Sequence, residues 1–343
     1  MVNQRRLERL LKQVQRLKQS DEYWAGTTRL ARMWITPDDE LPYRPYLTLL
    51  LSQGGKILSS NVLAQPPAAD ALFESLLRAM RRPALGAGRA RRPSLIYLDN
   101  AEQVAALRPL LEALKIQCVH RPTLAMADEV VAAMETQWGQ YELPPGLVSM
   151  PSVPLPLVGH LHELAAQFYR ATPWTWFHDQ HPFAIQVAPE EAPRYAIVMG
   201  NAGEVFGLSV YDTLDDLQLV FSPALSHQEV ARMSTWFVLF FEEAPAVSFD
   251  DLDAIAAHDW PVAAPQAYPV FGRSTADQGL ALPAKADLLW MEGALAGLLT
   301  YLDQHMVLRR GVPQLADVTM SVARVNEEAQ VRLQLLGFDA IFQ

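Results

Sequence analysis

Five arginines surround a Gly-Ala-Gly centre in the segment RRPALGAGRARRP, residues 81–93. They are Arg81, Arg82, Arg89, Arg91 and Arg92. Guanidinium groups bind phosphate oxygens through paired hydrogen bonds, so this cluster could hold a polyanion. Gly and Pro mark the segment as a loop, and no aromatic residue lies among the arginines to stack on a base. The sequence therefore leaves two readings open, a phosphate-binding loop and a solubilising surface loop.

A second cluster with chemical potential is ATPWTWFHDQHPF, residues 171–183. It places Trp174 and Trp176 close to His178, which favours either a binding groove or a plug of the core. Zinc requires three or four converging ligands. Pro173 and Pro182 disfavour the helix that would bring the histidines to one side. We therefore predict no metal site here.

Asp99 is the third candidate, at the end of the apolar run SLIYLD. A carboxylate at a strand end can bind Mg²⁺ or Mn²⁺ and activate water against a phosphodiester, but this chemistry needs two or three clustered carboxylates. Glu74 and Asp128 are further acids, and no spacing rule selects them. The other reading of Asp99 is the N-cap of a helix beginning at Ala101, a position shared with Asn100.

The first quarter of the chain holds most of the basic charge. Residues 1–92 contain 16 basic and 8 acidic side chains, and residues 93–343 contain 12 basic and 30 acidic ones. Residues 3–19 have leucines at helical spacing with basic residues around them, which predicts a basic amphipathic helix. Two readings are open: its apolar stripe docks on the protein's own body or on a second copy while the basic residues are merely solvated, or the helix contacts nucleic acid or an anionic membrane surface.

The elements that must position these residues follow from periodicity. In the first part we expect strands at 32–35, 46–52, 57–63, 94–99 and 116–120 and helices at 68–82, 101–115 and 125–137, with a hairpin turn at 53–56. In the second part we expect strands at 183–187, 195–200, 204–211, 235–241, 317–325 and 329–338 and helices at 161–171, 213–221, 249–260 and 285–305. A hairpin followed by strand-helix crossovers predicts an α/β domain with a mixed sheet, and the second part is predicted to be α+β.

These elements predict four regions along the chain. They are a basic amphipathic helix (1–24), an α/β domain (25–138), a Pro-rich linker (139–159) and an α+β domain (160–343). The linker prediction depends on the five prolines of 139–159 and the absence of basic residues there.

The order of elements in the first domain is similar to the ribonuclease H-like fold. That resemblance implies a divalent-metal nuclease with Asp99 as an essential carboxylate. Ser52 and Gln53 stand where the first strand of that fold would supply an acid, which puts the nuclease in doubt. In addition, YRPYLTLLLSQGGKIL with RRPSLIYLDN, and FYRATPWTWFHDQHPFAIQV with YAIVMGNAGEVFGLSVY, resemble adjacent domains of unknown function in uncharacterised bacterial proteins. This second resemblance covers most of 25–335 and implies a two-domain bacterial protein, with no activity attached.

Composition bounds the remaining possibilities. A single cysteine, Cys118, excludes an internal disulfide framework and favours a cytoplasmic location. No apolar run approaches the roughly 20 residues needed to cross a bilayer. We therefore expect a non-catalytic binding or scaffolding protein without a cofactor, whose partner is a protein or a nucleic acid and which could self-associate. The alternative is the Mg²⁺- or Mn²⁺-dependent nuclease.

Overall fold

The computed structural model describes residues 4–38, 40–138, 145–223, 225, 229–230, 233–275 and 279–342. The chain divides into two compact units, Met1–Glu142 (unit 1) and Leu143–Gln343 (unit 2). Each unit has its own sheet and its own hydrophobic core. Within these described ranges, no helix is both long and apolar enough to cross a membrane.

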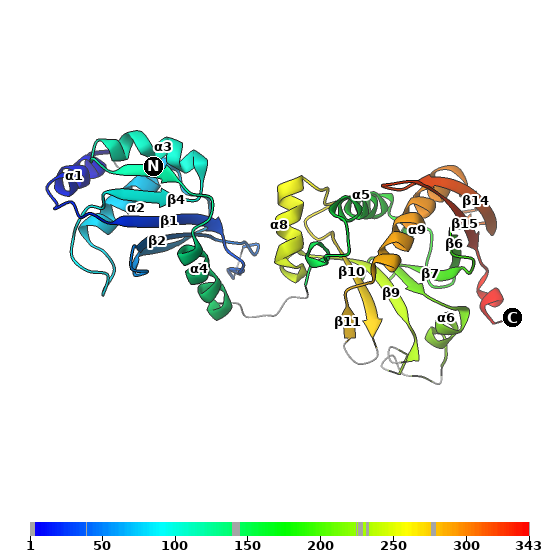
Figure 1. The fold of residues 1–343 in the computed structure, drawn as a ribbon. Coiled ribbons are helices and arrows are strands. Elements are labelled where there is room, and N and C mark those ends of the chain that lie inside the picture. Colours follow the sequence, from blue (N-terminus) through cyan, green and yellow to red (C-terminus); the bar gives the residue numbers. More distant parts are fainter. Residues whose placement is uncertain are drawn as a thin grey trace. The chain divides into compact units, whose positions relative to one another are not determined.

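Unit 1 is built on a mixed five-stranded sheet in the order β3-β2-β1-β4-β5. Its strands are β1 (Tyr23–Leu30), β2 (Tyr46–Ser52), β3 (Ile57–Leu63), β4 (Leu95–Leu98) and β5 (Gln117–His120). The central strand β1 is antiparallel to β2 and parallel to β4. β3 pairs antiparallel with β2, and β5 pairs parallel with β4. The prediction of a mixed sheet with helices packed on it is confirmed (Figure 1).

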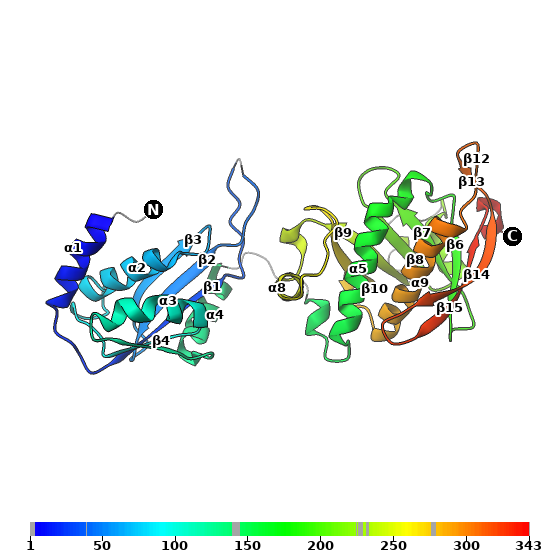
Figure 2. The same ribbon diagram turned by 90° about the horizontal axis from the view of Figure 1, so that it is seen from above.

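Helices cover both faces of this sheet. They are α1 (Gln4–Gln15), α2 (Ala69–Arg81), α3 (Ala101–Glu112) and α4 (Ala125–Trp138). α2 and α3 bury one face, where Trp24 and Ile96 lie, and α4 buries the other face over Ala25 and Leu49 (Figure 2). Successive side chains of a strand point to opposite faces, which is why Trp24 and Ala25 belong to different cores.

The sequence did not predict β1. A strand was expected at 32–35 instead, where Ile35 makes an isolated bridge to Tyr43. Gly26 interrupts the apolar pattern of β1, and a glycine usually weakens a strand. Here close packing requires it, because a Cβ atom at Gly26 would lie 2.8 Å from Cδ2 of Leu98.

Unit 2 contains an eight-stranded sheet in the order β11-β10-β9-β8-β7-β6-β15-β14. Its strands are β6 (Phe183–Val187), β7 (Arg194–Met199), β8 (Gly207–Tyr211), β9 (Trp236–Glu242), β10 (Tyr268–Thr275), β11 (Gly279–Ala281), β14 (Ala316–Ala323) and β15 (Glu328–Leu335). All neighbours in this sheet pair antiparallel. A separate ladder joins β12 (Leu308–Arg309) to β13 (Val312–Pro313).

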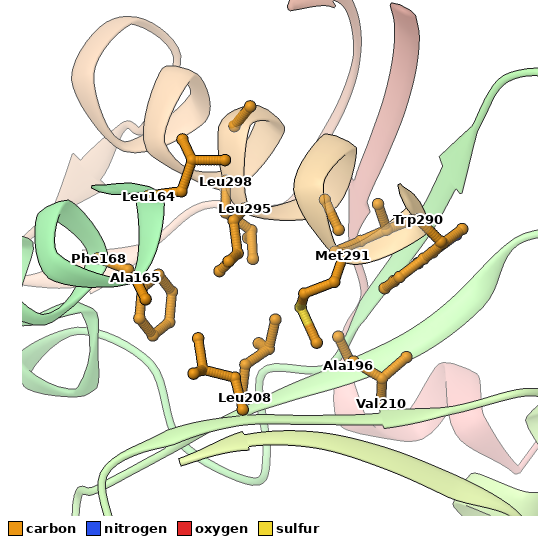
Figure 3. Packing of buried hydrophobic residues seen from close by; sticks show 14 of the residues in the cluster. Leu164, Ala165, Phe168, Ala196, Leu208, Val210, Trp290, Met291, Leu295 and Leu298 are labelled. Atoms are coloured by element: carbon orange, nitrogen blue, oxygen red, sulfur yellow. The ribbon is translucent and has the colours of Figure 1, made fainter. Parts of the chain in front are cut away.

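Two long helices form the core of unit 2 with one face of this sheet. The helices of the unit are α5 (Leu155–Ala171), α6 (Leu214–Val220), α8 (Phe249–His258) and α9 (Lys285–Gln304), with short 3₁₀ helices η1 (Leu147–Ser149), η2 (Pro173–Thr175), η3 (Ala244–Ala246) and η4 (Phe338–Ile341). Phe168 of α5, Met291 and Leu295 of α9 and Leu208 of β8 share the core (Figure 3). α6 and η4 pack around a smaller cluster centred on Leu217.

The segment expected to be an extended linker is partly helical. Residues 139–144 lie outside the described residues, and η1 and the first turn of α5 occupy part of 145–159. The carboxylate of Asp251 accepts hydrogen bonds from the backbone N–H groups of Leu147 and Val148, which holds η1 against α8. The prolines of 145–159 therefore precede and begin helices, because a helix tolerates proline in its first turn.

α9 approaches the sheet closely at two glycines. A Cβ atom at Gly293 would lie 2.5 Å from Cγ1 of Val187, and one at Gly297 would lie 2.7 Å from Cγ1 of Val331. Both valines are buried on strands, and β-branched side chains have little rotameric freedom. The two glycines therefore set the distance between this helix and the sheet.

Gly293→Ala should destabilise unit 2 by about 1–3 kcal/mol, because the added methyl group overlaps the buried Val187. The gain in helix propensity, about 1 kcal/mol, offsets only part of this cost. Thermal unfolding followed by circular dichroism measures the change. Gly54→Ala is the control, since no atom lies within 4 Å of the added group. A melting temperature unchanged by Gly293→Ala would contradict the close approach.

Candidate anion-binding site

α1 forms one wall of the candidate site. Leu10 and Val14 are buried, Leu7 and Leu11 are partly buried in the same core, and the helix packs against α2 (Figure 2). The reading in which the leucine stripe docks on the protein's own body is therefore confirmed. Because this apolar face packs on unit 1 beside α2, basic residues of α1 lie beside basic residues of α2.

The cavity between these helices is named here the arginine groove. It is lined by Arg6, Arg9, Leu10 and Gln13 of α1 and by Arg78, Arg81 and Arg82 at the C-terminal end of α2. Its volume is about 530 Å³, within the range of about 300–1,000 Å³ that is usual for small-molecule sites. On each helix the arginines are three or four residues apart, a spacing that puts side chains on one face. Five guanidinium groups from two helices therefore surround one volume.

Few negative charges compensate these arginines. Glu74 of α2 lies 3.3 Å from Nε of Arg6 and 2.5 Å from Nη2 of Arg78. Within the described ranges, Arg9, Arg81 and Arg82 form no ion pair, and Glu74 contacts only the other two groove arginines, Arg6 and Arg78. The groove consequently has a positive potential that attracts anions.

The five arginines predicted as a site divide into two groups. Arg81 and Arg82 line the groove, whereas Arg89, Arg91 and Arg92 do not. The Arg91 guanidinium lies 2.5 Å from Oε1 of Glu22, donates to the carbonyl of Ala87 and lies over the Trp24 ring. Arg92 donates to the carbonyl oxygens of Leu17 and Leu114. Arg91 and Arg92 thus fasten the loop to the body of unit 1, while Arg89 is exposed.

The sequence did not identify Arg6, Arg9 and Arg78 as site residues. Their signal was present as arginine pairs three residues apart, Arg6 with Arg9 and Arg78 with Arg81. Each pair indicates a basic face of one helix. The approach of the two faces depends on tertiary packing of α1, which the spacing alone does not reveal.

Asp99 is held by a network at the end of β4. Its Oδ2 accepts hydrogen bonds from Oγ1 of Thr27, at 2.5 Å, and from Nη2 of Arg29, at 3.1 Å. The same Arg29 nitrogen lies 2.8 Å from Oδ1 of Asp128 on α4. The prediction of an N-cap shared by Asp99 and Asn100 is confirmed for Asn100, whose side chain accepts the N–H of Gln103, and is wrong for Asp99. The strand that pairs in parallel with β4 is β1, whereas Ser52 ends β2 and Gln53 follows it. Ser52 and Gln53 therefore do not stand where the first strand of a ribonuclease H-like fold would supply an acid.

Other reactive groups show no catalytic arrangement in the part of the chain that the structure describes. There, no group of three or more His, Cys, Asp or Glu side chains could hold a metal ion. Cys118 is buried, and burial raises the pKa of its thiol to about 11, which disfavours the nucleophilic thiolate.

The two tryptophans predicted as a binding groove lie in different environments. Trp174 is buried in the core, where it packs against Phe168, Tyr169 and Phe206. Trp176 is 38% exposed and lines a cavity of about 500 Å³ beside the C-terminal ends of α5 and α9. His178 pairs with Asp179 and lies against His181, and it is not part of that lining. The structure therefore does not bring the three predicted residues into one site.

Two histidines of α5, the half-buried His160 and the buried His162, contact side chains of unit 2. His160 lies 2.7 Å from Glu292, whose other oxygen accepts from Nε of Arg324. His162 is buried and stacks on Trp260 at 5.0 Å between ring centres. Burial lowers the pKa of His162 to about 4, so it is neutral in the folded protein at neutral pH.

Both units match family models. Residues 10–135 match a domain of unknown function (DUF6930), and residues 159–304 match a second domain of unknown function (DUF7309). No curated protein matches the chain. The two adjacent matches indicate a protein of two domains, and the first of them includes most of the arginine groove.

The stability of unit 2 should fall as the pH drops from 6.5 to about 4. In this window the unfolded chain takes up a proton at His162 that the folded chain does not, which costs at most about 1.4 kcal/mol per pH unit. In His162→Phe, the urea midpoint should therefore depend less on pH. His258→Phe is the control, because His258 also stacks on Trp260 but is exposed. Equal pH dependence in wild type and His162→Phe would contradict this assignment.

Arg91→Gln and Arg82→Gln should differ in their effects on unit 1. The first removes the partner of Glu22 and the contact with Trp24, and we expect a loss of about 1–3 kcal/mol in the free energy of unfolding. The second removes an exposed arginine without an ion pair in the described chain, and its effect should stay within about 0.5 kcal/mol. Urea unfolding of both variants tests this. Equal losses would show that Arg91 is not an anchor.

Proposed function

We propose that this chain is a non-catalytic binding module and that unit 1 binds a phosphate-bearing polyanion in the arginine groove. The observation that carries the proposal is the convergence of five guanidinium groups on one open cavity, three of which, those of Arg9, Arg81 and Arg82, form no ion pair in the described structure. The planar fork of arginine matches two oxygens of a phosphate group, which favours phosphate over other anions.

The surroundings of Asp99 support a non-catalytic role. Metal-dependent phosphodiester cleavage needs carboxylates that are free to bind cations. Asp99 and Asp128 instead share the guanidinium of Arg29, which lies where both carboxylates converge. A divalent cation would have to displace this positively charged group.

A degenerate ribonuclease H-like nuclease is the second candidate. The strand order β3-β2-β1-β4-β5, with β2 antiparallel and β4 and β5 parallel to β1, supports a ribonuclease H-like arrangement. Asp99, directly after β4, is the residue that would serve as its essential carboxylate. Among the described residues, no group of three or more His, Cys, Asp or Glu side chains could hold a metal ion, which favours the binding module.

We further propose a bacterial, cytoplasmic protein. The resemblance of both units to bacterial domains supports the origin. A single buried cysteine supports a reducing compartment, where disulfides are rare.

Fluorescence anisotropy with labelled single- and double-stranded DNA and RNA, over a series of salt concentrations, tests the proposal. Two substitutions in the groove, Arg9→Gln with Arg82→Gln, define the groove variant. Loss of two phosphate contacts should flatten the plot of log binding constant against log salt by about 1.8 for duplex and about 1.4 for single strands. Parallel reactions with Mg²⁺ or Mn²⁺ report any change in strand length.

The matched control is Arg5→Gln with Arg89→Gln, which removes the same charge from α1 and from the loop after α2 but leaves the groove lining intact. It should keep nearly the wild-type slope. Equal losses in both double variants would contradict the groove as the binding site. Metal-dependent cleavage that Asp99→Asn abolishes would overturn the non-catalytic proposal in favour of the nuclease.

A further inference from the structure

We infer that the arginine groove recognises an oligophosphate, a chain of linked phosphate groups, through charge and without contact to a base. This inference rests on the proposed function and names the ligand class for the same site. It follows from the charge balance of the groove, the chemistry of its lining and the convergence of its arginines.

The charge balance favours more than one phosphate group. Arg9, Arg81 and Arg82 form no ion pair in the described chain, so at least three positive charges around the cavity are uncompensated. A single phosphate monoester carries about −1.5 to −2 at pH 7 and leaves part of this charge unneutralised. A ligand with two or more linked phosphates comes closer to neutralising the groove.

The lining provides no surface for a base. Apart from the arginines, the described part of the lining consists of Leu10, which is 7% exposed, and Gln13. Recognition of single-stranded nucleic acid usually depends on aromatic side chains that stack on successive bases. None of the described residues that line the groove is aromatic, so the nucleoside part of a ligand would gain little from them.

The arrangement of the arginines favours a compact anion. Arg6 and Arg9 occupy successive turns of α1, Arg78 lies in the last turn of α2, and Arg82 is the C-cap residue of α2. The four side chains line the same cavity from two helices instead of following one line along the surface. Groups placed in this way surround a clustered anion and can donate to several of its oxygens at once.

Two kinds of molecule carry the linked phosphate groups that the groove would bind, a free oligophosphate and a nucleic acid. Isothermal titration calorimetry with inorganic tripolyphosphate separates them, with ATP and a single-stranded oligonucleotide in parallel titrations. EDTA in the buffer keeps the anions free of divalent cations. The full-length chain, the groove variant and the control variant of the preceding subsection are each titrated, and circular dichroism verifies their folding.

We expect tripolyphosphate to bind the wild type and the control variant alike and to bind the groove variant at least about tenfold more weakly. ATP should bind no more tightly than tripolyphosphate, because its base gains no stacking partner. Tenfold tighter binding of ATP would overturn recognition by phosphate alone. Groove-dependent binding of the oligonucleotide without binding of tripolyphosphate would overturn this inference and leave the proposed function intact. Absence of binding by all three anions would overturn both.

Discussion

The pairing of β1 with β4 is the interaction on which unit 1 depends. β1 joins the antiparallel hairpin of β2 and β3 to the parallel pair β4 and β5, so one sheet forms from both parts. An isolated bridge between Gln19 and Arg92 continues this parallel contact before β1 begins. The same pairing brings Arg29 to Asp99 and places Glu22 beside Arg91. These two ion pairs of unit 1 thus follow from a backbone register.

Local sequence patterns predicted many of the helices and strands, and two of the missed strands, β1 and β10, have a common physical cause. The leucine spacing predicted α1, and the Gly-Gly turn between β2 and β3 was confirmed by the positive φ of Gly55, 75°. β1 and β10 were not predicted because each contains a glycine, Gly26 or Gly272, that weakens the strand pattern. At both positions a neighbouring leucine, Leu98 or Leu280, fills the space of the missing side chain. This packing depends on tertiary contacts, which the periodicity of a local sequence does not reveal.

The candidate site could be predicted only in part. The sequence shows the arginines of 81–92, but local spacing does not reveal which of them form ion pairs or hydrogen bonds within the folded chain. In the structure, Arg91 pairs with Glu22 and Arg92 donates to the carbonyl oxygen of Leu114, so both stabilise unit 1. In unit 2, Arg194 pairs with Asp287 and Arg324 with Glu292. The groove arginines without ion pairs contrast with this use of charge. A cluster of like charges that the fold does not need is the kind of local conflict expected at a functional site.

The arginine groove can form because the hydrophobic packing of α1 on unit 1 outweighs the repulsion between the arginines that this packing brings together. Two like charges 4 Å apart in water repel by about 1 kcal/mol, and the groove arginines include exposed ones such as Arg6, at 62%, and Arg78, at 51%. Burial of a leucine or valine side chain contributes about 1.5–3 kcal/mol, and α1 buries Leu10 and Val14 on unit 1. An anion in the groove would remove the repulsion and leave the apolar contact intact. Anion binding should therefore be coupled to the docking of α1, so that each stabilises the other.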